Sequence, residues 1–312
     1  MVFSLLGGFV LLFLAGELLV RGASSLAERL GVQPLVIGIV IVGFGTSVPE
    51  LATSVRAALQ GAPGIAMGNI VGSNMANMLL ILGAGALIYP IATKRLHVFR
   101  DGGFGALGAV LLGLAAWYGE LTRFAGIVLV TALVGYLWFL IHDDHKQRRA
   151  QDEENDVERV SLLSSAVLID GLILLSGIAG VLLGGKFLVD GAVEMARVYG
   201  IEESIVGLTV VALGTSLPEL ATSIIAAFKR QTDLAVGNVL GSNVYNIFGI
   251  GGATAVITPV SISPHMAAVD IPLLIALSVA LIGIIVWQHG VTRLTGVAFL
   301  MGYCAYVFAL LA

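Results

Sequence analysis

The residues of this chain that could do chemistry occur in two near-identical copies. Glu50 lies in the block 45–54 and Glu219 in the block 214–223, and these blocks differ only in the residue before the proline. Both read Gly-Thr-Ser-Val/Leu-Pro-Glu-Leu-Ala-Thr-Ser. On a helix, the threonine and serine lie four and three residues before the carboxylate and therefore share its face. Carboxylate, hydroxyl and carbonyl oxygens are the ligands that hard cations such as calcium and sodium prefer.

A stripe of amides and hydroxyls follows each block. Its members recur every four residues and are Asn69, Ser73 and Asn77 in the first half, and Asn238, Ser242 and Asn246 in the second. The stripes are separated by 169 residues, the same offset that separates Glu50 from Glu219. Self-similarity at a fixed offset indicates an internal duplication. We expect each stripe to face the glutamate-bearing helices.

The prolines of the two blocks predict a break in each helix. Pro49 has no amide hydrogen, so the carbonyl of Gly45 loses its helical partner, and Pro218 does the same to Gly214. Backbone oxygens freed in this way are tolerated at membrane depth only where they line a cavity or coordinate an ion. We therefore expect a kink immediately before each glutamate.

The composition of the chain is that of a polytopic membrane protein. Hydrophobic residues make up 58% of the 312 residues and charged residues 12%, whereas soluble domains carry roughly 25% charged residues. The single Cys304 excludes a disulfide within the chain and a cysteine-based metal site. The apolar run 2–20 has no basic residues ahead of it, and we expect a retained first span rather than a signal peptide.

Apolar windows of about 20 residues, the length of a membrane-spanning helix, predict an all-α fold of ten transmembrane helices. The windows are roughly 2–29, 34–59, 64–90, 102–119, 122–142, 161–197, 203–229, 232–257, 267–288 and 292–311. The charge-dense stretch after His142 divides the chain into a first repeat (1–142), a linker that we expect to be a solvated cytoplasmic loop (143–160) and a second repeat (161–312). Because each repeat has an odd number of spans, the repeats would be inverted relative to one another, with binding sites between them near the midplane.

The distribution of basic residues predicts that both termini lie outside, because cytoplasmic loops collect Lys and Arg. With that orientation the inner side holds Arg21, Arg29, Lys94, Arg95, Arg100, Lys146, Arg148, Arg149, Arg159, Lys229, Arg230 and Arg293, and the outer side only Arg56, Arg123 and Arg197. Asp101 and Asp270 align at the repeat offset, each just before an apolar run, and fit helix N-caps.

The position of the two glutamates favours a cation site. Glu50 and Glu219 lie near the centres of their spans, and neither has a Lys or Arg within a helical turn. A charged side chain at that depth costs several kcal/mol unless something compensates it, and a transported cation is the simplest source of the missing charge. Buried protonated acids that hold helices together are the blander alternative. The absence of Cys and His near either motif argues against zinc and copper.

The doubled pattern GTS-[VL]-PEL followed by GN-[IV]-[VL]-GSN resembles the two alpha repeats of the sodium/calcium exchanger family, within the cation/calcium antiporters. The resemblance covers essentially the whole chain and is closest to prokaryotic members. It implies an integral protein of the prokaryotic inner (plasma) membrane that exchanges sodium for calcium by alternating access. The long, glycine-rich first and sixth spans resemble the family's sliding gate helices.

The resemblance also implies a role for each motif residue. Glu50 and Glu219 would share the calcium ion. The other ligands would be backbone carbonyls of Thr46 and Thr215 with Ser47 and Ser216 beside them, Ser73 and Ser242 at flanking sodium sites, and Asn77 and Asn246 in the middle of the pocket. Some relatives, including potassium-dependent ones, carry Asp at the position of Asn246, so its absence argues against potassium dependence.

Other functions remain open from the sequence. A proton/calcium exchanger, or an exchanger of another divalent cation, is the main alternative, since membrane glutamates also carry protons. Known proton-coupled relatives usually have Asn-Ala in place of Thr-Ser and no following proline. We find no nucleophile and base pair, no cofactor motif and no nucleic-acid signal, and the near-identical frames of the two acids argue against a membrane enzyme. A cation channel is a further alternative, but inverted halves with broken helices favour alternating access over an open pore. Calcium ions, sodium ions and the lipid bilayer are the only partners that the sequence indicates.

Overall fold

The chain folds almost entirely into helices. A computed structural model describes residues 2–93, 98–155, 165–198 and 212–311. Helices are labelled α, and π-helical segments η. The elements of the first half are α1 (Val2–Leu30), α2 (Pro34–Ile37), η1 (Gly38–Gly43), α3 (Phe44–Thr46), α4 (Val48–Leu59), α5 (Pro63–Met75), η2 (Ala76–Ile81), α6 (Leu82–Ile88), β1 (Ile91–Ala92), η3 (Val98–Gly102), α8 (Gly103–Trp117), β2 (Glu120–Leu121) and α9 (Arg123–Asn155).

The second half repeats this order at the offset found in the sequence. Its elements are α10 (Ser165–Val198), α12 (Ala212–Thr215), α13 (Leu217–Phe228), α14 (Thr232–Val244), η5 (Tyr245–Gly251), α15 (Gly252–Ile257), β3 (Val260–Ser261), η6 (Met266–Asp270), α16 (Ile271–Gln288), β4 (Gly290–Val291) and α17 (Arg293–Leu311). The π-helical segments recur at equivalent places, so η2 corresponds to η5 and η3 to η6. Such segments are often found at functional sites.

Seven helices of the described chain are long and apolar enough to cross a membrane, or eight if the bent pair Pro34–Thr46 and Val48–Leu59 is one span. The sequence predicted ten spans. Part of one predicted span, 203–229, lies outside the described residues, and its described part consists of α12 and the shorter apolar helix Leu217–Phe228. The predicted span 232–257 is continuous helix through α14, η5 and α15, although it is not among the seven.

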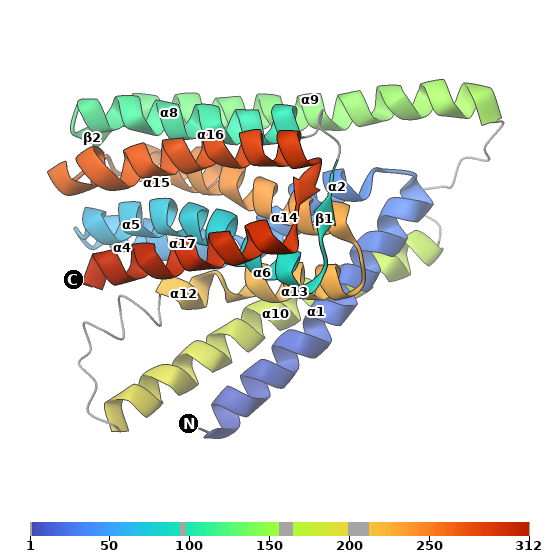
Figure 1. Cartoon of the computed structure of the whole chain (residues 1–312), viewed down its shortest axis with the longest axis horizontal. Helices are drawn as coiled ribbons and strands as arrows, with labels where there is room; N and C mark the ends of the chain where they lie inside the picture. The colour runs from blue at the N-terminus through green and yellow to red at the C-terminus, as the bar shows by residue number, and fades with distance from the viewer. Residues whose placement is uncertain (1, 94–97, 156–164, 199–211, 312) are drawn as a thin grey trace.

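The helices that carry the polar stripes lie in the middle of the bundle, and helices such as the C-terminal α17 lie outside (Figure 1). Within the span Pro63–Ile88, 78% of the most apolar window is buried, against 11% for Arg293–Leu310. Every residue of α14 from Leu234 to Val244 is buried. Side chains of α14 therefore have protein on all sides, as helices around a polar site in a membrane require.

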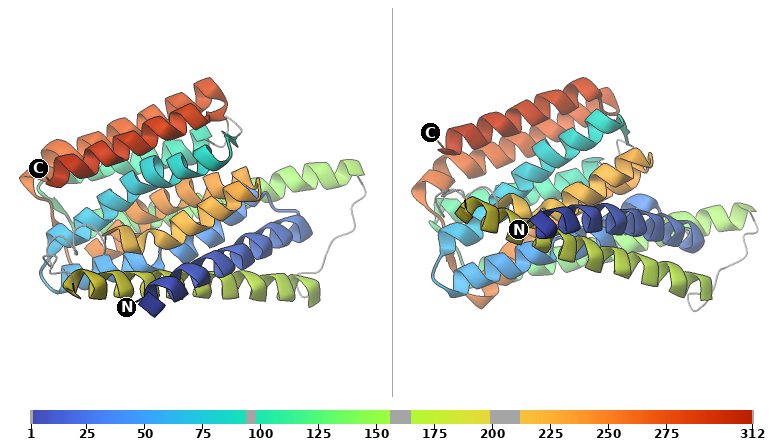
Figure 2. Two further views of the ribbon diagram at one scale, coloured as in Figure 1. Left: turned by 60° about the horizontal axis from the view of Figure 1, so that its bottom comes forward. Right: turned by 90° about the horizontal axis from the view of Figure 1, so that it is seen from below.

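Helices α1 and α10 lie side by side along one edge of the bundle (Figures 1 and 2). Glycines let them approach closely: a Cβ atom on Gly22 would lie 2.5 Å from the backbone nitrogen of Leu174, and one on Gly177 would lie 2.4 Å from that of Leu19. Small residues at such crossings are typical of helix packing in membranes. At one end of this pair, Arg29 forms an ion pair with Asp170.

Two short antiparallel ladders join the halves. Strand β1 pairs with β4, and β2 pairs with β3. The sequence offset relates β1 to β3 and β2 to β4. Strand β1 therefore pairs with the counterpart of β2, and β2 pairs with the counterpart of β1. Each ladder thus joins one strand of the first half to one strand of the second half.

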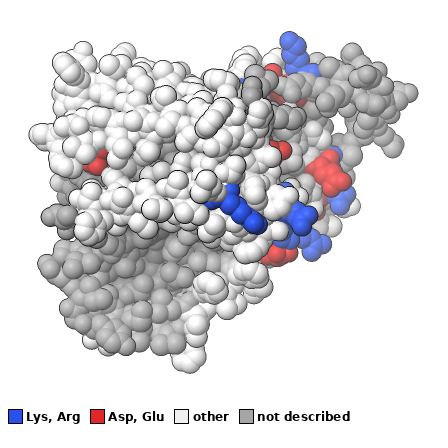
Figure 3. Space-filling model, viewed as in Figure 1, with Lys and Arg blue, Asp and Glu red and all other residues white. Residues whose placement is uncertain are grey.

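Charged side chains gather at one end of the face seen in Figure 3, the end that holds β1 and the beginning of α2 in Figure 1. Near this end the guanidinium of Arg230 lies over the ring of Tyr89, 5.5 Å from its centroid. Arg100 binds Asp143 at 2.9 Å. On this face, basic and acidic side chains therefore lie together at one end (Figure 3).

Two details differ from the sequence prediction. Helix α9 does not end at His142 but continues to Asn155, so the expected loop is helical as far as that residue; its run of charged residues and alanine includes good helix formers. The N-cap interpretation of the two aligned aspartates is also wrong. Asp101 is buried and accepts hydrogen bonds from Arg100 and Tyr136 instead, and Asp270 accepts one from Tyr306.

Candidate cation site

Each glutamate lies in the first turn of a helix that begins immediately after a break. Ser47 separates α3 from α4 and has φ −84° and ψ 6°. Ser216 separates α12 from α13 with nearly the same conformation, φ −89° and ψ 5°. The axes on the two sides of Ser47 differ by 44°. The predicted break before Glu50 is therefore confirmed, and it places the carboxylate at the amide end of a new helix, where negative charge is stabilised.

The two motifs are bound to each other crosswise. Ser47 of the first motif donates a hydrogen bond from Oγ to Oε1 of Glu219 at 3.1 Å. Ser216 of the second motif donates to Oε1 of Glu50 at 3.3 Å. Both carboxylates are buried, with 2% and 1% of the residue exposed. The two breaks therefore meet, and each carboxylate is held by the serine of the other half.

The second oxygen of each carboxylate has no protein partner. Oε2 of Glu50 and Oε2 of Glu219 are buried and accept no hydrogen bond from the described residues. None of the ion pairs between described residues involves either glutamate. Buried polar atoms are normally satisfied, and a buried carboxylate without a compensating charge is costly. These two oxygens are therefore the strongest indication of a cation site.

Three further site oxygens from the polar stripes are also unpartnered. They are Oδ1 of Asn77, Oδ1 of Asn246 and Oγ of Ser242, all buried among the described residues. Asn77 lies in η2 and Asn246 in the equivalent η5, and η5 packs against both α4 and α5. Ser73 differs from its counterpart because its Oγ lies 3.4 Å from that of Ser216, which donates to it.

The threonine hydroxyls are used within the protein. Oγ1 of Thr46 lies 3.0 Å from the carbonyl of Val42 and 3.3 Å from Oδ1 of Asn238. Oγ1 of Thr215 donates to Oδ1 of Asn69 at 3.4 Å. These bonds use the hydroxyl hydrogens, so both the hydroxyl lone pairs and the backbone oxygens of the two threonines remain as candidate ligands. The sequence resemblance implied the backbone oxygens, and that assignment stays a prediction.

The donor set of the site consists of oxygen. Among the described residues no group of three or more His, Cys, Asp or Glu side chains comes together. The two carboxylates would thus be complemented by hydroxyl, amide and backbone oxygens, which suit calcium and sodium better than zinc or copper. Two carboxylates provide two negative charges, enough to neutralise one divalent ion.

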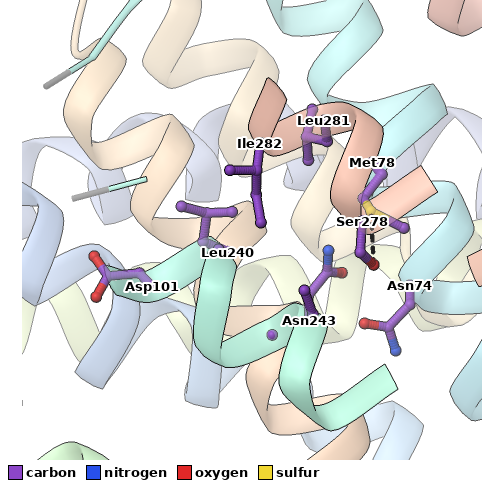
Figure 4. Close-up of a pocket in the computed structure, with 11 residues that line it drawn as sticks. Asn74, Met78, Asp101, Leu240, Asn243, Ser278, Leu281 and Ile282 are labelled. Atoms are coloured by element: carbon purple, nitrogen blue, oxygen red, sulfur yellow. Dashed lines mark hydrogen bonds between the residues drawn. The ribbon is translucent and has the colours of Figure 1, made fainter. Parts of the chain in front are cut away.

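A small pocket lies beside the site (Figure 4). Its lining includes Asn74, Asn243 and Ser278 at one end and Asp101 at the other. Oδ1 of Asn243 accepts a hydrogen bond from Nδ2 of Asn77 at 3.0 Å. The side chain of Asn243 therefore connects the pocket with the stripe residues of the site.

The structure adds residues that the sequence analysis did not place in the site. Asn69 and Asn238, noticed only as members of the stripes, bond the backbone of the glutamates. Ser54 and Ser223 accept hydrogen bonds from these asparagines. Both serines end the duplicated ten-residue block, four residues after the glutamate. Their repetition was the signal that could have identified them.

Comparison with known proteins places this arrangement in a family. The family model described as "Sodium/calcium exchanger protein" matches residues 1–142 and 170–312. The chain is 34% identical to the "Putative antiporter CaxA" of Alkalimonas amylolytica, over 97% of this chain and 96% of that protein. It is 33% identical to a sodium/calcium exchanger of Methanosarcina acetivorans (98% and 97% covered) and 33% identical to the inner membrane protein YrbG of Escherichia coli (95% and 92% covered).

Solved structures show the same fold. A structure of the sodium-calcium exchanger NCX_Mj soaked with Na+ and Ca2+ superposes with a TM-score of 0.85 at 29% sequence identity, covering 99% of this chain and 98% of that one. A second structure of that exchanger, soaked without either ion, gives a TM-score of 0.86. By its sequence over nearly the whole length and by its fold, this chain is a member of the sodium/calcium exchanger family of membrane transport proteins.

Proposed function

We propose that this protein is a secondary antiporter that exchanges sodium for calcium across the membrane by alternating access. The observation that carries the proposal is the pair of buried carboxylates, Glu50 and Glu219, each with one oxygen that no described residue satisfies. Antiport of calcium fits the family of the chain and the relatives named above. According to this proposal the protein is a transporter and not an enzyme, and the calcium and sodium ions are its substrates.

The architecture that we propose has ten membrane-spanning helices in two inverted repeats. The repeats would be 1–142 and 161–312, joined by a cytoplasmic linker at 143–160, with both termini outside the prokaryotic inner membrane. The crosswise pairing of strands β1 with β4 and β2 with β3 supports the inversion. The gathering of charged side chains at one end of the molecule supports the assignment of that end to the cytoplasm.

In the proposed site, Glu50 and Glu219 share the calcium ion. Their unpartnered Oε2 atoms would bind the ion together with backbone oxygens of Thr46 and Thr215, and Ser47 and Ser216 would hold the opposite carboxylate in place. The remaining assignments are Ser73 and Ser242 at flanking sodium positions, and Asn77 and Asn246 at the middle of the pocket.

Coupling would follow from the charge of the site. Calcium and sodium compete for overlapping oxygens around the same two carboxylates, so one kind of cation excludes the other. A site with two uncompensated negative charges is costly to close off from water, so the protein would change its accessibility only when loaded. The glycine-lined contact between α1 and α10 supports a role of this pair as the moving element.

The test is counterflow of labelled calcium in proteoliposomes, with sodium, potassium and proton gradients applied separately. We expect calcium movement driven by sodium at clamped pH in the parent protein, and none in Glu50→Gln or Glu219→Gln. Both variants should still be extracted as folded protein, because glutamine keeps the shape of the side chain.

The same experiment decides between the two coupling ions. Calcium flux that follows the proton gradient and ignores sodium would replace this proposal with a proton/calcium exchanger. Normal sodium-driven flux in both glutamine variants would reject the site itself.

A further inference from the structure

The two asparagines that open the polar stripes have contacts that ion binding does not explain. Nδ2 of Asn69 donates to the backbone carbonyl of Glu50 at 3.0 Å and to Oγ of Ser54 at 2.8 Å. Its Oδ1 accepts a hydrogen bond from Thr215 of the other motif at 3.4 Å. One side chain on α5 is therefore attached both to the glutamate-bearing helix of its own half and to the last residue of α12 in the other half.

Asn238 makes the equivalent contacts from α14. Its Nδ2 lies 3.3 Å from the carbonyl of Glu219 and 3.0 Å from Oγ of Ser223. Its Oδ1 lies 3.3 Å from Oγ1 of Thr46, whose single hydroxyl hydrogen is shared with the carbonyl of Val42. The asparagine is fully buried.

These contacts use both kinds of polar group that an amide offers. An asparagine side chain has two hydrogens to donate and one oxygen that accepts, and here both groups are bonded to protein. Neither amide touches a carboxylate oxygen in the described contacts. The two side chains therefore differ from Asn77 and Asn246, whose Oδ1 atoms are buried without a partner.

The planar amide is a short, rigid connection. Through Asn69 the backbone of Glu50 is held at a fixed distance from Thr215, and through Asn238 the backbone of Glu219 is held at a fixed distance from Thr46. The two connections cross, so together they set how far apart the two glutamate backbones lie. Hydrogen bonds of this kind are strengthened by the low dielectric constant of a buried environment.

We propose that Asn69 and Asn238 are positioning residues that fix the separation of the two carboxylates and thereby set the size of the divalent cation that the site prefers. This inference rests on the proposed function. Calcium accepts oxygens at about 2.3–2.6 Å, and a larger ion of the same charge, such as strontium, needs the same oxygens farther apart. A site held by two rigid crossed connections would resist that expansion.

The test compares calcium and strontium transport in proteoliposomes for the parent, Asn69→Ala and Asn238→Ala. For both variants we expect the half-saturating calcium concentration to rise roughly tenfold, the effect of losing a buried hydrogen bond or two. The strontium value should rise less, so the preference for calcium should shrink. The maximal rate should change less than the half-saturating concentrations.

Asn74→Ala is the matched control. Asn74 is also a buried asparagine of α5, but its Nδ2 donates to the carbonyl of Ile70 within the same helix, at 2.7 Å. We expect this variant to lower the unfolding temperature without changing the ratio of calcium to strontium half-saturation. If Asn69→Ala and Asn238→Ala also left the ratio of calcium to strontium half-saturation unchanged, as Asn74→Ala should, the inference would be overturned. The two asparagines would then have a purely structural role.

Thr215→Val provides a second test if the alanine variants do not fold. It keeps the backbone carbonyl and removes the hydroxyl that bonds Asn69 across the halves, and we expect the same loss of calcium preference. An unchanged ratio in this variant would contradict the inference. If the parent itself shows no sodium-driven calcium transport, the proposed function fails first, which distinguishes the two failures.

Discussion

The two halves of the site have almost the same sequence and most of the same hydrogen bonds, yet they are not equivalent. Ser47 binds Glu219 as Ser216 binds Glu50. The single hydroxyl hydrogen of Ser216, however, is shared with Ser73 of the first stripe, whereas Ser242, the counterpart of Ser73, has no hydrogen-bond partner among the described residues. Duplication therefore fixes the kind of contact, and the surroundings of each copy decide which contacts are made.

The flanking regions differ more than the motifs. In the first half, the buried Asp101 is held by Arg100 at 2.6 Å and by Tyr136 at 2.9 Å. In the second half, Asp270 is held by Tyr306 at 3.3 Å, and Nδ1 of the exposed His265 lies 3.5 Å from its carboxylate. The position equivalent to Arg100 is an apolar Val269. Of the two aligned aspartates, only Asp101 thus pairs with an arginine that precedes it in the chain.

The largest effects that test the equivalence of the two halves are expected from substitutions of the glutamates. If the halves contribute equally to one shared site, Glu50→Gln and Glu219→Gln should reduce calcium transport by the same amount. Losing one partner of a buried charge interaction costs about 2–5 kcal/mol, which corresponds to a loss of at least roughly 30-fold. Initial rates of calcium uptake in proteoliposomes measure this. A variant that keeps near-normal transport would show that its half does not hold the ion.

The flanking aspartates should respond unequally. Arg100→Gln removes the partner of a buried carboxylate, and because the arginine side chain is only 16% exposed we expect a cost of about 3 kcal/mol. His265→Gln changes an exposed contact and should cost less than about 1 kcal/mol. Thermal unfolding in detergent measures both. Equal shifts in unfolding temperature would contradict the asymmetry.

The crosswise serines should behave alike. Ser47→Ala and Ser216→Ala each remove a hydrogen bond to a carboxylate of the opposite half, worth about 1.5–3 kcal/mol. We expect the half-saturating calcium concentration to rise by roughly tenfold in either variant. Cysteine scanning cannot replace this test, because a thiol is a weaker donor. If only one of the two variants loses affinity, the crosswise arrangement is not what holds the carboxylates.

The stripe serines should show the smallest effects and the clearest difference between the halves. The hydroxyl of Ser242 bonds none of the residues that the structure describes, so Ser242→Ala should leave the unfolding temperature unchanged and raise the half-saturating sodium concentration a few-fold. Ser73→Ala also removes the acceptor of Ser216, so it should lower the unfolding temperature by the equivalent of about 1 kcal/mol. Sodium dependence of calcium efflux, combined with thermal unfolding, separates the two.

Much of the site was predictable because its residues are repeated. The offset between Glu50 and Glu219 led to the paired stripes, and the prolines led to the helix breaks that are now seen at Ser47 and Ser216. Sequence patterns of this kind report on local structure, since a missing amide hydrogen acts within one helical turn.

The crosswise contacts could not be predicted. Nothing in the spacing of Ser47 distinguishes its own Glu50, three residues away, from Glu219 in the other half, and the structure places the hydroxyl on Glu219. The role of Asn69 in joining Glu50 to Thr215 was hidden for the same reason. The interpretation of Asp101 as a helix cap was wrong because its carboxylate is bonded by its chain neighbour Arg100 and by Tyr136, 35 residues away, which only packing brings to it.

The sequence by itself determined that this protein is a duplicated membrane transporter with one glutamate, two hydroxyls and a broken helix in each half, because these properties depend on residue type and on spacing within a helix. Only the tertiary structure decided which oxygens are bonded and which remain open. That choice depends on how two halves, far apart along the chain, pack against each other in an interior where every unsatisfied polar atom costs free energy.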